Sequence, residues 1–140
     1  MGVVFIVTTV TSSQHIFDAA TFLFQAEQKW PGCKTFIDDP DADVTDAEVN
    51  VSPADGPSFT VSHYPDNHMV SIDGNPDNSA EVAAWVRSLH PDPDLILWYT
   101  DDGFRGHTAL FPGITADQVA KGWIDHQEHD PYKEFPDYFQ

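Results

Sequence analysis

The pattern of apolar and polar residues divides the chain into several short strands. The run from Val3 to Val10 is rich in β-branched residues, which is typical of a strand. Residues 58–64 and 68–74 alternate apolar and polar side chains on either side of a Pro-Asp-Asn turn, which favours an antiparallel pair with one buried face. The same criteria predict strands at 48–53, 95–100 and 107–111, and residues 33–37 can form a further short one.

Three segments have the spacing of apolar residues that is typical of helices. They cover residues 12–30, 78–90 and 115–127. Pro-Gly ends the first, and Pro91 ends the second. The predicted N-caps are Ser12 or Ser13, Asn78 and Thr115. A glutamate or glutamine follows three residues after the second and third caps, as in a capping box.

The order of these elements predicts the fold class. It reads β-α-β-β-β-α-β-β-α, in which adjacent strands prevail over alternation of strands with helices. We therefore expect an α+β fold, with a mainly antiparallel sheet of about five to six strands and three helices packed on one face. A chain of 140 residues is expected to form one domain. An acidic loop at 38–48 and an acidic, aromatic tail at 128–140 belong to that domain.

The charge of the chain narrows the classes of partner. Acidic residues number 23 and basic residues 6, which gives a net charge of -17 and a pI near 4.3. Such a surface repels phosphate backbones and anionic membranes, so we expect neither nucleic-acid nor membrane binding. It attracts a basic protein and speeds association with it. The alternative is that the acidity only confers solubility or reflects a biased proteome.

The redox state and the location of the protein follow from other sequence features. The single cysteine, Cys33, permits no internal disulfide. The segment MGVVFIVTTVTSSQ has no basic residue before its short apolar run, so it is not predicted to be a signal peptide or a membrane span. A reducing cytoplasm is the expected location.

The segment WYTDDGFRGHTALFPG contains the densest polar cluster. Asp101, Asp102, Arg105 and His107 lie within it, beside two glycines that suit a hairpin turn. The turn explains the first three residues, since aspartates accept backbone hydrogen bonds and pair with arginine, but it does not explain His107. No nucleophile stands in a recognisable motif, so a structural hairpin is favoured over a catalytic site. Recognition of a partner by the loop tip stays open.

The acidic loop has half of the calcium-loop pattern. Asp39, Asp41 and Asp43 stand at positions 1, 3 and 5, but Val44 and Asn50 replace the glycine and the glutamate that the pattern requires. We therefore predict no metal site and no cofactor. A solvated loop that contacts a basic partner is the favoured interpretation.

The stretch LILWYTDDGFRGHTALFPGIT, followed by a closing helix, completes a resemblance of the whole chain. In size, α+β order and acidic surface, the chain resembles the immunity proteins of bacterial polymorphic toxin systems. The resemblance implies a cytoplasmic protein that binds a cognate toxin, often over the toxin's active site.

The predicted function is an acidic protein-binding domain that neutralises a basic partner, and not an enzyme. Carboxylates steer it to the partner, and aromatic anchors contribute contact energy. The predicted partner-binding residues are Asp38, Asp39, Asp41, Asp43, Asp101, Asp102, Arg105, Tyr132 and Tyr138. Two alternatives stay open. One is a small enzyme or ligand-binding domain that uses Asp101 to His107, with a pocket beside the hairpin and a perturbed His107 pKa. The other is a homodimer formed through the aromatic first helix.

Overall fold

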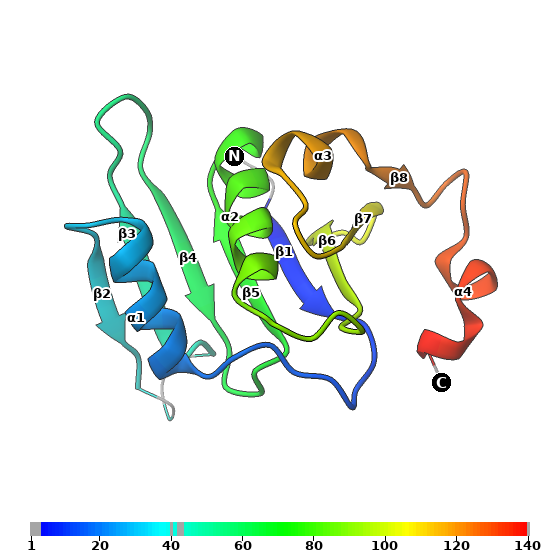
Figure 1. The fold of residues 1–140 in the computed structure, drawn as a ribbon, viewed down its shortest axis with the longest axis horizontal. Helices are drawn as coiled ribbons and strands as arrows, with labels where there is room; N and C mark the ends of the chain where they lie inside the picture. The colour runs from blue at the N-terminus through cyan, green and yellow to red at the C-terminus, as the bar shows by residue number, and fades with distance from the viewer. Residues whose placement is uncertain (1–3, 40, 42–43, 140) are drawn as a thin grey trace.

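The chain forms a single antiparallel sheet with three helices on one face (Figure 1). This computed structural model describes residues 4–39, 41 and 44–139. The α+β class and the mainly antiparallel sheet are confirmed, but the described residues contain eight strands and four α-helices, more than predicted. The strands are β1 (Val4–Thr9), β2 (Lys34–Ile37), β3 (Ala47–Val51), β4 (Phe59–His63), β5 (Met69–Asp73), β6 (Leu97–Asp101), β7 (Gly106–Leu110) and β8 (Ile124–Asp125).

The first strand holds the sheet together at its centre. The strand order is β2-β3-β4-β5-β1-β6-β7-β8, so two meanders flank β1. Phe5 of β1 lies opposite Ile72 of β5 on one side and opposite Asp101 of β6 on the other. A continuous run of β-branched residues suits a strand that has neighbours on both sides.

Three helices cover one face of the sheet. They are α1 (Ala19–Lys29), α2 (Pro76–Ser88) and α3 (Ala116–Lys121). Helix α1 packs on β3, α2 packs on β1, β5 and β7, and α3 packs on α2 and β7 (Figure 1). The core between them and the sheet includes Val7, Phe22, Val49, Val61, Val70, Ile72, Val82 and Val86, all fully buried.

The predicted start of the first helix is wrong. Helix α1 begins at Ala19, well after Ser12 and Ser13, because the carboxylate of Asp18 accepts the Thr21 N–H at 2.8 Å and caps the helix there. Residues 15–18 have no regular structure and lead the chain up to the helix.

Local capping signals also decide the starts of the other two helices. Helix α2 begins at Pro76 and not after Asn78, because Asn75 is the cap and its side chain accepts the Asn78 N–H at 2.8 Å. Proline at the first helical position is compatible with this start, since no N–H is needed there. Helix α3 has the predicted capping box of Thr115 and Gln118.

The C-terminal segment packs on the face of the sheet opposite the three helices. It contains a fourth helix, α4 (Pro131–Glu134), and a 3-10 turn, η1 (Pro136–Phe139). Trp98 of β6 projects toward it, with ring centroids 5.3 Å from Phe135 and 5.8 Å from Phe139. The aromatic residues of the tail therefore cover β6 and β7 from outside.

No helix within the described ranges combines the length and the apolar character needed to cross a bilayer.

Candidate functional site

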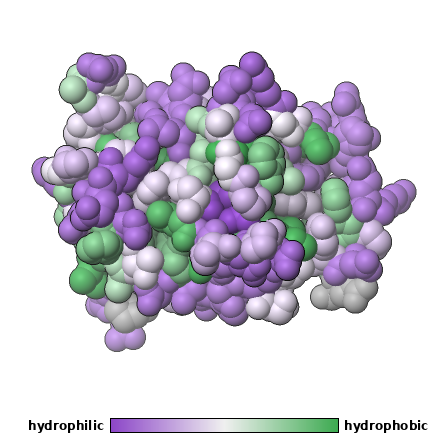
Figure 2. All heavy atoms as spheres, in the orientation of Figure 1, coloured by the Kyte–Doolittle hydropathy of each residue, from purple (hydrophilic) through white to green (hydrophobic). Residues whose placement is uncertain are grey.

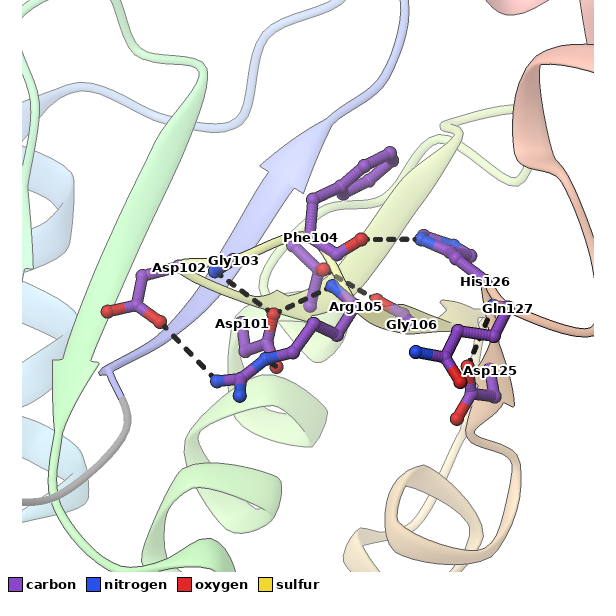
Figure 3. Close-up of polar contacts among 10 residues, drawn as sticks. Asp101, Asp102, Gly103, Phe104, Arg105, Gly106, Asp125, His126 and Gln127 are labelled. Atoms are coloured by element: carbon purple, nitrogen blue, oxygen red, sulfur yellow. Dashed lines mark hydrogen bonds and ion pairs between the residues drawn. The ribbon is translucent and has the colours of Figure 1, made fainter.

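The turn between β6 and β7 is a polar hairpin whose hydrogen bonds centre on Asp101. One carboxylate oxygen of Asp101 accepts the N–H groups of Gly103 at 3.2 Å and Arg105 at 3.0 Å. The other oxygen accepts the Arg105 Nε–H at 3.0 Å. The Arg105 side chain extends past Asp101 toward Asp102, whose nearest oxygen is 4.0 Å away (Figure 3). Asp101 is only 7% exposed, so its carboxylate acts inside the turn.

Substitutions in the hairpin should separate the contribution of the backbone hydrogen bonds to Asp101 from that of its ion pair with Arg105. Asp101→Ala leaves two backbone N–H groups without their acceptor, and we expect it to lower the free energy of unfolding by about 2 kcal/mol. Arg105→Ala should cost less than about 1 kcal/mol, since the arginine side chain is 64% exposed and such pairs contribute little. Urea unfolding followed by tryptophan fluorescence measures both. Equal losses would show that the ion pair, and not the backbone bonds, stabilises the turn.

A cleft of about 540 Å³ opens beside this hairpin, on the face of the sheet that carries the helices. Its apolar walls come from β1, α2, β6 and α3, and its floor is aromatic. Phe5 and Tyr99 stack with centroids 5.2 Å apart, and Trp123 meets Tyr99 edge-on at 6.0 Å. Burial raises the pKa of Tyr99, so the hydroxyl of Tyr99 stays neutral. The full lining is Phe5, Pro76, Ala80, Tyr99, Asp101, Arg105, Val119, Ala120, Trp123 and Asp125.

The charged groups of the cleft lie among these apolar walls. Asp101, Arg105 and Asp125 line it, which leaves one carboxylate in excess of the guanidinium. Asp125 is exposed, and its Oδ1 accepts a local backbone N–H, that of Gln127, at 2.8 Å. Aromatic walls with a surplus carboxylate are suited to a cation, which the ring faces and the carboxylate both attract.

Two important residues of this cleft were missed by sequence reasoning. The sequence predicts that Trp123 and Asp125 lie in a third helix extending to residue 127, but that helix ends at Lys121 and β8 follows. Gly106 allows the Trp123 ring to lie close to the backbone of β7, because a Cβ at position 106 would stand 2.4 Å from that ring. Gly106 within a predicted hairpin was the available signal, since a glycine in a strand often marks a place where another group approaches the backbone closely.

His107 lies in a separate cluster. Its side chain is buried and stacks on Trp98, with ring centroids 3.7 Å apart. His126 Nδ1 lies 2.7 Å from the carbonyl oxygen of Phe104, so it must donate there (Figure 3). His126 Nε2 lies 2.8 Å from His107 Nδ1, so the two rings share one hydrogen bond. His107 Nε2 is buried and has no hydrogen-bond partner within the described residues.

The environment of His107 keeps its ring neutral. Burial, followed by the charge that His126 would carry, lowers the pKa of His107 from 6.5 to about 4. Because residues alternate along β7, His107 shares the outer face of the sheet with Trp98, whereas Tyr99 and Asp101 face the helices and the cleft. The cleft and the perturbed histidine therefore do not form one acid–base site.

The predicted acidic residues near β2 are held in a loop of their own. Asp38 Oδ2 accepts the hydroxyl proton of Thr45 at 2.6 Å, and Asp39 Oδ1 accepts the Asp41 N–H at 2.9 Å. Asp43 lies outside the described residues. Across the part of the chain that the structure describes, no group of three or more His, Cys, Asp or Glu side chains is arranged to hold a metal ion.

The predicted partner-binding residues fall on three separate surfaces. The acidic loop joins β2 and β3, and β4, β5 and β1 separate that pair from the hairpin on β6 and β7. Tyr132 and Tyr138 lie on the outer face, where Tyr138 stacks on Phe135 and Tyr132, 58% exposed, approaches Phe104. Of these surfaces, only the hairpin adjoins the large cleft.

No protein-family model matches the chain, and the searches of curated proteins and of solved structures found no significant match.

Proposed function

We propose that the protein is an acidic binding domain that neutralises a basic partner protein, as an immunity-type inhibitor of a bacterial toxin or effector does. The cleft beside the hairpin is the observation that carries the proposal. It is the anchor site for a lysine or arginine side chain of the partner.

The walls of the cleft match the two ends of such a side chain. The methylene stem of a lysine or arginine packs on apolar and aromatic surface, here Tyr99 and Trp123, while its cationic end needs carboxylates. Asp125 supplies an exposed carboxylate, and Asp102, 55% exposed, stands on the other side of Arg105. Interfaces draw most of their free energy from a few such desolvated anchors.

The net charge supports the same partner. At -17 the domain creates a negative field that accelerates the approach of a basic protein and slows its departure. The hydrogen bonds of Asp101 hold the charged hairpin in one conformation, so we expect little entropy to be lost when a partner binds it.

The first experiment identifies the partner and then tests the cleft. The tagged domain captures proteins from a lysate of its source organism at about 50 mM and about 500 mM NaCl. A captured protein is purified, and its binding is measured by calorimetry and stopped flow. We expect a basic protein in a 1:1 complex, with an association rate that falls at least about tenfold between the two salt concentrations.

A matched pair of variants separates specific anchoring from general charge. Ala120 is exposed on α3 and lines the cleft, so Ala120→Phe fills the cleft without disturbing the core. Ala54, exposed in the β3–β4 loop, provides the control Ala54→Phe. Ala120→Phe should weaken binding at least about 100-fold and the control less than about threefold. Equal affinities for the two variants would refute the anchor site.

The cleft volume favours one second candidate. About 540 Å³ lies within the range of small-molecule sites, so binding of an organic cation is the alternative. Because His107 faces away from the cleft, the alternative is ligand binding without acid–base catalysis by that residue. Saturable binding of a purified amine that is lost in Ala120→Phe, with no protein captured, would favour it.

A further inference from the structure

The outer edge of the outermost strand, β2, pairs with no other strand among the described residues. Figure 1 shows β2 at the margin of the sheet, paired with β3 on one side only. The Asp38 N–H donates to the backbone carbonyl oxygen of Asp46 at 3.0 Å. This bond continues the register of the pairs Phe36–Glu48 and Lys34–Asn50. Antiparallel pairs alternate, so the backbone N–H and C=O groups of Thr35 and Ile37 point away from β3.

The side chains at this edge do not protect it. Ile37 is 85% exposed and Phe36 is 44% exposed. Proteins commonly guard free edges with charges, prolines or bulges, and an exposed apolar edge is a site where another strand pairs. Only Lys34 provides a charge within β2, and the ion pairs found among the described residues do not include it.

The sequence of the edge is complementary to itself. From Lys34 to Asp38 it reads KTFID, with a base at one end, an acid at the other and an aromatic residue in the middle. A two-fold axis through Phe36 would place two antiparallel copies with Thr35 opposite the partner's Ile37. The four outward backbone groups of each copy would then form four hydrogen bonds.

The side chains would match in the same register. Lys34, Phe36 and Asp38 share one face of the strand because residues alternate. Phe36 would meet the partner's Phe36, and Lys34 would stand opposite the partner's Asp38 on both sides of it. Among the described residues, the Thr45 hydroxyl bonds Oδ2 of Asp38, which leaves Oδ1 for this ion pair. Opposite charges and paired aromatic rings at facing positions each stabilise strand pairing.

We propose that two copies of this chain pair through their β2 edges and extend the sheet across a two-fold axis. A second copy fits this edge better than a basic strand of the neutralised partner, because Lys34 would repel a basic strand but attracts Asp38. The face that carries the helices argues against a dimer through them. On the face shown in Figure 2 hydrophilic residues prevail, and the apolar residues form separate groups.

The expected dimer is weak and is strengthened by salt. One four-residue strand buries less surface than a standard stable interface, so we expect a dissociation constant on the order of 100 µM. Two bodies of charge -17 repel each other, and salt screens that repulsion. Raising NaCl from about 50 mM to about 1 M should therefore tighten the dimer by about fivefold or more. Binding of a basic partner has the opposite salt dependence, so the two proposals can fail separately.

Sedimentation velocity of the full chain, from about 10 µM to about 1 mM at both salt concentrations, tests the proposal. Ile37→Lys changes an exposed side chain at the edge and should weaken the dimer at least about tenfold. Phe111→Lys is the matched control, since Phe111 is 48% exposed and follows β7, on the other side of β1. It should leave the dimer unchanged.

Charge exchange tests the register. Lys34→Asp places acid opposite acid and should weaken the dimer about tenfold, and Lys34→Asp with Asp38→Lys should restore it. Three results would overturn the proposal: a monomer at about 1 mM in about 1 M NaCl, a dimer that Ile37→Lys leaves intact, or no rescue by the exchanged pair. Ala120→Phe should leave dimerisation unchanged, which keeps this test independent of the cleft.

Discussion

Acidification from pH 7.5 to pH 4.5 should destabilise the wild-type protein by about 2.5 kcal/mol more than it destabilises His107→Phe. His107 is 1% exposed, and its pKa in the folded protein is lowered from 6.5 to about 4. Between these values the unfolded chain binds a proton that the folded protein excludes. The stability that the neutral ring contributes is therefore complete above about pH 6.5, falls as the pH decreases, and is lost below about pH 4.

Phenylalanine is the informative replacement because it fills the ring's place on Trp98 and has no proton to bind. Urea unfolding at several pH values, followed by tryptophan fluorescence, gives the free energy of unfolding of both proteins. The prediction concerns the difference between the two free energies of unfolding at each pH. The net charge of -17 approaches zero near the pI of 4.3, and the loss of charge repulsion affects the wild type and His107→Phe alike. His129→Gln, at an exposed histidine, is the control and should follow the wild type. Parallel pH curves for wild type and His107→Phe would contradict the assignment.

Local signals in the sequence predicted the class of the fold and part of its boundaries. The alternation in β4 and β5 and the capping box at Thr115 are encoded by residues a few positions apart, and both are present. The start of α1 was wrong because Ser12, Ser13 and Asp18 are all residues that cap helices. Only packing of the chain before α1 against the sheet decides among them.

The site was harder to predict than the fold because its residues meet over long separations. Asp101 and Arg105 were found through the hairpin, but the cleft also needs Phe5 from the other end of the chain and Trp123 beyond α3. The apolar pattern of the sequence did not predict β8, because a strand of two residues is too short to show a periodic pattern. His107 was the one polar residue that the turn did not explain, and the structure assigns it to the opposite face of the sheet.

His63 is the second residue where a single substitution should have a large effect. Its ring is fully buried between α1 and the sheet, and stacks on Phe22 with centroids 5.5 Å apart. Nδ1 lies 2.7 Å from a carboxylate oxygen of Asp46, and Nε2 lies 2.7 Å from the carbonyl oxygen of Phe17. Both contacts are shorter than 3 Å, so the His63 ring joins the Phe17 carbonyl to the Asp46 carboxylate and fixes the chain before α1 to β4.

We expect His63→Phe to lower the free energy of unfolding by about 3 kcal/mol, because it keeps the ring volume but leaves the Phe17 carbonyl and the Asp46 carboxylate without donors. Asp46→Ala removes the carboxylate, and the Asp46 side chain is 25% exposed. We therefore expect Asp46→Ala to lower the free energy of unfolding by less than His63→Phe does. In the double variant no unpaired carboxylate remains, so the total loss should be smaller than the sum of the single losses by about 1 kcal/mol or more. Urea unfolding of the four proteins measures this coupling. Strict additivity would mean that His63 acts through ring packing alone, and that the bond to Asp46 contributes nothing to holding α1 on the sheet.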